Sequence, residues 1–295
     1  MKTLELGHVP LPLRDPVLVV ALDGWTDAGG GGSLALQALH DQFDTTPIGR
    51  FDPDALFDYR DRRPQLEIDQ GALGDLHWPE LVVRLVSPPT GPQLVTLAGA
   101  EPDLSWRGVA DDVAELCRLL GVHRYVGLGS VPGPIPHTRP VHTIFTGTDE
   151  GLLEQLGRPH EQVVVPASCQ VALEKMLADT GIDTLGMWVR IPHYVAGEYP
   201  QASRSLLEQL AGHLGIVLDT TVFDATIEEN RVRLDVAGES SEEVLEHIRQ
   251  LEQLYDAERH HGSGLSRGPS VVMSEEDVPS GDELAAEIER FLRDR

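Results

Sequence analysis

The feature that most constrains the fold is an uninterrupted apolar run near the N-terminus, followed at once by a glycine-rich turn. Residues 16–22 read Pro-Val-Leu-Val-Val-Ala-Leu, without the alternation of apolar and polar positions expected of a half-exposed strand. Such a run is typical of a strand buried on both faces. After the polar turn at residues 23–32, Ser33 can cap a helix that continues to about residue 43. The segment therefore predicts a strand, a tight turn and a helix.

Similar strand and helix patterns alternate along the chain up to residue 214. Strand patterns lie at residues 66–68, 81–86, 94–97, 125–128, 143–145 and 185–191, and helix patterns at 105–120, 149–156, 168–180 and 201–214. Alternation of this kind favours a mostly parallel sheet with helices on both faces. We therefore predict an α/β domain over residues 1–218.

The pattern changes after residue 218. Residues 219–235 give a weak helix signal, whereas residues 240–243 (Ser-Ser-Glu-Glu) are a strong helix start with apolar residues at helical spacing beyond them. The Gly-, Ser- and Pro-rich stretch 262–279 is typical of a flexible linker, and residues 282–293 predict a second amphipathic helix. We expect residues 219–295 to form an acidic helical appendage, packed on the α/β body or on a neighbouring subunit.

Charge and composition exclude several classes of function. The formal net charge is −25, from 48 acidic and 23 basic residues, so the chain repels phosphate backbones and anionic lipid and is not expected to bind nucleic acid or membranes. No run approaches the roughly 18 to 20 apolar residues of a membrane-spanning helix, and the first residues lack the apolar core of a signal peptide. We expect a cytoplasmic protein in which Cys117 is a buried, inert thiol. No metal-ligand spacing is present, and neither a metal nor a cofactor is predicted.

The turn after the first strand is a candidate ligand-binding loop. It contains Asp23, Gly24, Trp25 and Asp27, and the glycine amides beside a helix N-terminus can hold an anion. The glycine spacing matches neither a phosphate-binding loop nor a dinucleotide fingerprint. The alternative is a structural turn in which Asp27 bonds local amides and Trp25 packs on a neighbour.

Two further clusters admit a binding or a structural role. Arg63 ends a group of three arginines within residues 60–63, which either binds a carboxylate or phosphate or neutralises nearby aspartates. Glu101 and Asp103 precede the helix pattern at 105–120. They are either acids in the first turn of that helix, where they favour its dipole, or a catalytic pair of carboxylates.

A proline-rich segment at residues 134–140 presents His137, Thr138 and Arg139 on a stiff loop directly after a strand pattern. His193 follows another strand pattern in the same way. If the two strands are parallel neighbours, both histidines could line one crevice, with His137 as general base and Arg139 as a carboxylate clamp. The alternative is that these side chains hold loop backbone through hydrogen bonds. We assign no catalytic residue.

Taken in order, six motifs resemble the PAC2 family of proteasome assembly chaperones in its actinobacterial form. They are Gly-Trp-Thr-Asp-Ala-Gly at 24–29, Phe-Asp-Pro-Asp at 51–54, Asp-Tyr-Arg-Asp-Arg-Arg-Pro at 58–64, Gly-Ala-Glu-Pro-Asp-Leu-Ser-Trp at 99–106, Pro-His-Thr-Arg-Pro at 136–140 and Pro-His-Tyr at 192–194. The resemblance implies a three-layer α/β/α sandwich similar to nucleoside phosphorylases, with a helical appendage. It also implies a homo-oligomer, for instance a trimer, with proteasome subunits or another protein as partner.

The sequence departs from the family in two ways. Family chaperones that dock in proteasome pockets can end in a hydrophobic residue, a tyrosine and any residue, whereas this sequence ends Arg293-Asp294-Arg295. The run Gly30-Gly31-Gly32 is also richer in glycine than the usual family turn, which can loosen the turn or open it to a ligand. Separately, the label of ATP-grasp or carboxylate–amine ligase that such chains sometimes carry finds no support, because no lysine-bearing glycine loop is present. We therefore favour a non-catalytic, homo-oligomeric protein-binding factor. The alternative is an enzyme or a binder of a nucleoside- or carboxylate-like small molecule.

Overall fold

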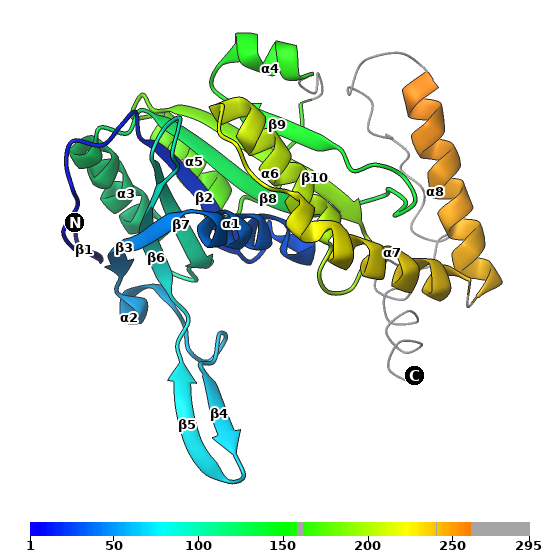
Figure 1. Cartoon of the computed structure of the whole chain (residues 1–295), viewed down its shortest axis with the longest axis horizontal. Helices are drawn as coiled ribbons and strands as arrows, with labels where there is room; N and C mark the ends of the chain where they lie inside the picture. Colours follow the sequence, from blue (N-terminus) through cyan, green and yellow to red (C-terminus); the bar gives the residue numbers. More distant parts are fainter. Residues whose placement is uncertain (158–161, 240, 261–295) are drawn as a thin grey trace.

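A computed structural model describes residues 1–157, 162–239 and 241–260, and its centre is one eight-stranded sheet (Figure 1). The strand order is β1 (Leu4–Leu6), β3 (Asp44–Phe51), β6 (Leu81–Ser87), β7 (Leu94–Ala100), β2 (Val17–Asp23), β8 (Arg124–Gly133), β10 (Asp183–Pro192) and β9 (Thr143–Gly147). The pairs formed by β7, β2, β8 and β10 are parallel, and all other pairs are antiparallel.

The prediction of a mostly parallel sheet is therefore wrong, and the sheet is mixed. The connection between β6 and β7 covers only residues 88–93. A parallel crossover needs about a dozen residues or more, so this short connection joins antiparallel neighbours. Strands β1 and β3 were not predicted, because β1 has three residues and β3 contains Pro47 and Gly49 at a bulge.

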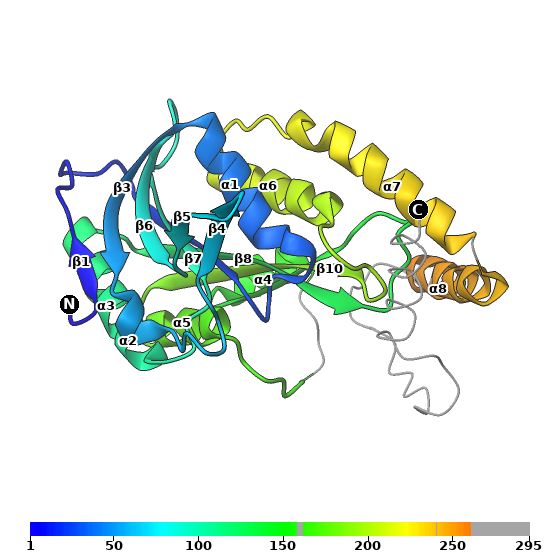
Figure 2. The same cartoon turned by 90° about the horizontal axis from the view of Figure 1, so that it is seen from below.

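Helices cover both faces of the sheet, which confirms the three-layer α/β/α architecture (Figure 2). On one face lie α3 (Trp106–Leu120) and α5 (Cys169–Ala178), and on the other α1 (Gly31–Gln42) and α6 (Pro200–Leu214). Each helix has an apolar stripe that fits this placement. On α3, for example, Val109, Val113, Leu116 and Leu120 recur at helical spacing and are all buried. The likeness to nucleoside phosphorylases stays a prediction.

Two short helices, two 3₁₀ turns and a hairpin are attached to this body. They are α2 (Pro53–Leu56), α4 (Glu150–Leu156) and the 3₁₀ turns η1 (Ala28–Gly30) and η2 (Thr221–Phe223). Strands β4 (Gln65–Asp69) and β5 (Ala72–His77) form a separate hairpin that projects from the body (Figure 1). The strand predicted at residues 66–68 is present, but it belongs to this hairpin and not to the main sheet.

The C-terminal part forms two further helices, α7 (Asp224–Gly238) and α8 (Glu242–His260). Both lie beside the α/β body in Figures 1 and 2, and Val244, Ile248 and Leu251 of α8 pack with Ala237 of α7 and Tyr194 of the body. The predicted linker at 262–279 and the helix at 282–293 lie outside the described residues. No helix in the described part of the chain is long and apolar enough to cross a membrane.

Candidate functional site

Most of the predicted site residues lie where the central parallel strands end. Strands β2, β7, β8 and β10 run in the same direction, so their carboxyl ends meet at one edge of the sheet. Open α/β sheets usually bind ligands at this edge. Asp23 ends β2, Glu101 directly follows β7, and His137 and His193 lie on the loops after β8 and β10.

In the turn after β2, Asp27 is committed to the backbone of its own loop. Its Oδ1 accepts hydrogen bonds from the amides of Gly32 at 2.6 Å and Ser33 at 3.2 Å, at the start of α1. Desolvation raises the pKa of the Asp27 carboxyl. These bonds match the structural interpretation of the turn. Trp25, however, does not pack on a neighbour as that interpretation expected, because it is 69% exposed.

The glycines of the turn allow a close approach between α1 and strand β8. A Cβ atom at Gly32 would lie 2.5 Å from the carbonyl oxygen of Leu128, and one at Gly31 would lie 2.4 Å from Oγ of Ser130. Neither distance leaves room for a side chain. The glycine run is therefore needed for packing, whether or not the turn also contacts a ligand.

Glu101 holds together three loops at this edge. One carboxylate oxygen accepts from the amide of Trp25 at 2.9 Å, and the other accepts from the amide of Cys169 at 2.6 Å. The expectation that Glu101 and Asp103 occupy the first turn of a helix is wrong, because α3 begins only at Trp106. Asp103 instead accepts a 2.8 Å hydrogen bond from the amide of Asp58.

Cys169, beside Glu101, is not an activated nucleophile. Its thiol is buried, and desolvation together with the Glu101 charge raises its pKa to about 12. Desolvation likewise raises the pKa of the buried Cys117 thiol to about 12, as its predicted inert character requires.

The arginine loop lies partly at the same edge. Arg62 reaches Asp23 at 3.7 Å, and Arg60 pairs with Asp58 at 3.3 Å. Arg63 is exposed, and its side chain has no ionic partner among the described residues. Arg60 and Arg62 thus neutralise nearby aspartates, whereas Arg63 is a cation without an ionic partner in the described part of the chain.

His137 forms a closed hydrogen-bonded group with Tyr194 and Asp235. The amide of His137 donates to the Tyr194 hydroxyl at 2.8 Å, and that hydroxyl lies 2.7 Å from Nδ1. Nε2 lies 3.2 Å from a carboxylate oxygen of Asp235 on α7. Desolvation lowers the pKa of His137, which favours the neutral ring. A ring that accepts from Tyr194 at Nδ1 and donates to Asp235 from Nε2 satisfies all three groups.

Arg139 and Thr138 bind helix α8. The Arg139 guanidinium makes two parallel hydrogen bonds to Asp256, at 2.9 and 2.7 Å, and a third to Glu252 at 3.1 Å. These carboxylates raise the pKa of Arg139. The Thr138 hydroxyl donates to the same Glu252 oxygen at 2.5 Å. The proline-rich loop therefore presents its polar side chains to the C-terminal helices.

His193 makes the same kind of connection from the loop after β10. Its Nε2 lies 3.3 Å from Nε2 of His247 on α8, and its amide donates to the carbonyl of Gly133 at 3.1 Å. Desolvation lowers the pKa values of both His193 and His247. We use the term tail contact for the bonds of His137, Thr138, Arg139 and His193 to α7 and α8.

A family model for the PAC2 family matches residues 21–236, which include the whole strand-end edge. The chain belongs to the PAC2 family. No curated protein matches the sequence.

Solved PAC2-like structures share the architecture. The Mycobacterium tuberculosis protein Rv2714, of unknown function, is 34% identical with a TM-score of 0.82, over 88% of this chain and 93% of its own. A Corynebacterium glutamicum protein of unknown function is 30% identical with a TM-score of 0.83, over 89% and 100%. Rv2125 of M. tuberculosis, described as a proteasome-assembly chaperone homologue, is 26% identical with a TM-score of 0.73, over 79% and 99%.

In this PAC2 chain the predicted residues other than Arg63 divide into two groups. Asp23, Gly24, Trp25, Asp27, Glu101 and Asp103 surround the ends of β2 and β7, whereas His137, Thr138, Arg139 and His193 form the tail contact. Sequence reasoning missed the partners Asp235, His247, Glu252 and Asp256. The four-residue spacing of Glu252 and Asp256 on one helix face was a usable signal.

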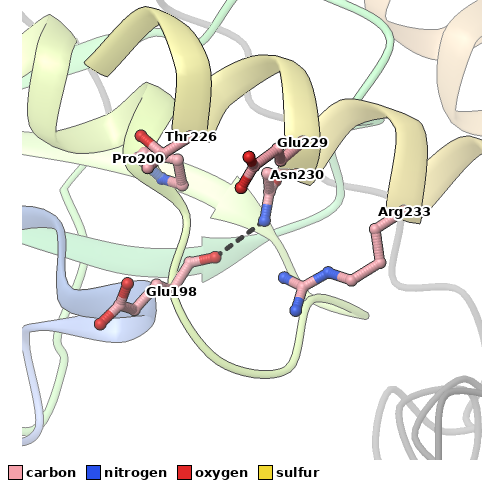
Figure 3. A pocket seen from close by; sticks show the side chains of 6 residues that line it. All are labelled: Glu198, Pro200, Thr226, Glu229, Asn230 and Arg233. Carbon is pink, nitrogen blue, oxygen red and sulfur yellow. Dashed lines mark hydrogen bonds between the residues drawn. The ribbon is translucent and has the colours of Figure 1, made fainter. Parts of the chain in front are cut away.

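An open pocket of ≈ 360 Å³ lies between α7 and the loop before α6 (Figure 3). Its lining comprises Glu198, Pro200, Thr226, Glu229, Asn230 and Arg233. Asn230 donates a 3.0 Å hydrogen bond to the carbonyl of Glu198, shown dashed in Figure 3. None of the predicted site residues lines this pocket. Within the described residues, no group of His, Cys, Asp or Glu is placed to hold a metal ion.

Proposed function

We propose that this PAC2 chain is a non-catalytic, homo-oligomeric protein-binding factor. The observation that carries this proposal is that the carboxylates at the strand ends are hydrogen-bonded to backbone amides. Both oxygens of Glu101 accept backbone amides, Asp27 accepts the amides of Gly32 and Ser33, and Asp103 accepts the amide of Asp58. A general acid or base must be presented to its substrate, whereas each of these carboxylates is held by backbone amides of its own fold.

The histidine and arginine of the proline-rich loop support the same proposal. His137 is bonded at both ring nitrogens, and Arg139 binds two carboxylates of α8. Their partners come from the C-terminal helices and leave neither side chain directed at a vacant crevice. The roles of general base and carboxylate clamp that the sequence left open are therefore disfavoured.

Exposed apolar side chains support a function in which the protein binds other proteins through its surface. Trp25, Leu104 and Trp78 are 69%, 51% and 48% exposed, on segments near the ends of β2 and β7 and at the base of the hairpin. Exposed aromatic residues are typical anchors of protein interfaces. Rv2125 is described as a proteasome-assembly chaperone homologue, and proteasome subunits are accordingly the first partners to test.

Native mass spectrometry of the protein purified from its own cells tests this proposal. A homo-oligomer that carries proteasome subunits or another defined protein supports it. Trp25→Ala should weaken binding of that partner about tenfold or more, whereas Val217→Ala, another exposed residue, should leave binding unchanged. A small molecule released on denaturation would instead support the alternative function of a nucleoside- or carboxylate-like ligand binder, and a bare monomer would contradict the proposal.

A further inference from the structure

The pocket beside α7 is not used by the proposed function and differs in chemistry from the strand-end edge. It lies between α7 and the loop that leads into α6, as Figure 3 shows. Its volume of ≈ 360 Å³ is within the range of small-molecule sites. Its lining contains two carboxylates, one guanidinium, one hydroxyl and one amide side chain. The charges and hydrogen-bonding groups of these side chains therefore define what the pocket can bind.

Asn230 brings a buried, unsatisfied acceptor to this pocket. The side chain is only 6% exposed, and its Nδ2 donates to the carbonyl of Glu198 at 3.0 Å. Its Oδ1 has no hydrogen-bond partner among the described residues. A buried acceptor without a partner costs about 1–3 kcal/mol. A bound molecule that donates a hydrogen bond to this oxygen would therefore be stabilised in the pocket.

The charged residues of the lining are unpaired, unlike their neighbours on the same helix. Arg231 pairs with Glu228 at 2.7 Å and with Asp235 at 3.0 Å. Glu229 and Arg233 have the four-residue spacing that favours such a pair, but no ion pair joins either of them to another described residue. The Arg233 side chain instead extends toward the loop before α6 (Figure 3). Both charges are thus available to a ligand.

The exposed carboxylate of Glu198 completes the set, and it also lacks an ionic partner within the described ranges. Two carboxylates and one guanidinium leave the pocket with one net negative charge. A basic amino acid carries the complementary set at neutral pH, namely one carboxylate and two cationic groups. We propose that this pocket binds a free basic amino acid of the lysine or arginine type.

Each group of such a ligand has a counterpart in the lining. A guanidinium binds a carboxylate through two parallel hydrogen bonds, so Arg233 is the counterpart of the ligand carboxylate. Glu198 and Glu229 are the counterparts of its cationic groups, and an ammonium hydrogen supplies the donor that Oδ1 of Asn230 lacks. A phosphate ester or a dicarboxylate would instead face two carboxylates and a single guanidinium, in a chain of net charge −25.

Isothermal titration calorimetry of the whole chain with L-lysine and with L-arginine tests the class of ligand. Two analogues of lysine are the comparison compounds, because cadaverine lacks the carboxylate and L-norleucine lacks the side-chain ammonium. We expect saturable binding of a basic amino acid, and an affinity for each analogue that is lower by about three- to tenfold. A chain that binds neither L-lysine nor L-arginine saturably would overturn the proposal. The protein-binding function would then still stand, because it does not depend on this pocket.

Matched variants on α7 test whether binding occurs in this pocket. Arg233→Gln should weaken binding of the amino acid about three- to tenfold and leave the weaker binding of cadaverine unchanged, because cadaverine has no carboxylate. Glu229→Gln should weaken binding of both compounds. Arg231→Gln and Glu228→Gln change residues outside the lining and should leave both affinities unchanged.

Far-ultraviolet circular dichroism and melting temperatures like those of the wild type would show that these four variants fold. An amino-acid affinity that is the same in the wild type, in Arg233→Gln and in Glu229→Gln would overturn the assignment to this pocket.

Discussion

Glu101→Ala separates a structural from a catalytic role for the most central carboxylate of the strand-end edge. The substitution removes the acceptor for two amides, those of Trp25 and Cys169. The Cys169 amide is shielded, so losing a charge-assisted bond there costs about 1.5–3 kcal/mol, whereas the exposed Trp25 amide regains water and costs about 0.5–1 kcal/mol. We expect the free energy of unfolding to fall by about 2–4 kcal/mol.

The assay is thermal and urea-induced unfolding, with two companion variants. For Glu101→Ala the melting temperature should fall on the order of 5–10 °C. Glu101→Gln has only one acceptor oxygen and should lose about 1–2 kcal/mol. Asp103→Asn keeps the single acceptor that the Asp58 amide needs, and should change stability by less than about 1 kcal/mol. A Glu101→Ala protein as stable as the wild type would refute the assigned structural role.

Three further predictions concern the tail contact and the glycine turn. Arg139→Ala removes the guanidinium that binds Asp256 and Glu252 of α8, and hydrogen exchange should show α8 opening more easily by about 1–2 kcal/mol. His137 and His193 of the tail contact have native pKa values below the ordinary 6.5, so the unfolded state binds more protons below that pH. We therefore expect α7 and α8 to be most protected from hydrogen exchange above about pH 6.5 and to lose protection as the pH falls. Gly32→Ala should destabilise the fold by about 1–3 kcal/mol, because its Cβ would clash with the Leu128 carbonyl. Gly212→Ala in α6 has open space around it and should instead stabilise the fold by about 0.5–1 kcal/mol. Chemical unfolding measures both variants, and equal effects on stability would contradict the packing argument.

Local patterns predicted the central strands, the edge strand β9 and most helices of this fold, but not strands β1, β3 and β5. Strand β2 was predictable because a strand buried on both faces needs apolar side chains at every position, and α3 because its buried residues recur at helical spacing. Strand β3 alternates exposed and buried residues irregularly around its bulge, so no period-two signal identified it. The sheet is mixed because the β6–β7 connection is too short for a parallel crossover. The length of that connection was visible in the sequence and could have predicted the antiparallel pair.

The sequence allowed the positions of the site residues to be predicted, but not their structural roles. Glu101 was recognised as a notable acid, but its partners Trp25 and Cys169 are 76 and 68 residues away in the sequence. Only the folded sheet brings those loops together, so proximity in sequence suggested a helix cap that does not exist. The same holds for Arg139, whose carboxylate partners lie 113 and 117 residues further along the chain.

The distribution of hydrogen-bonded and exposed groups supports the proposed choice of recognition over chemistry in this chain. At the edge where α/β enzymes usually place free polar groups, the carboxylates of Asp27, Glu101 and Asp103 are bonded to backbone amides. Exposed apolar side chains lie beside this edge at Trp25 and on the hairpin at Ile68 and Leu73. Exposed apolar area carries a free-energy cost that association with another protein surface relieves. The contrast between amide-bonded carboxylates and exposed apolar side chains therefore supports the proposed role of a protein-binding factor.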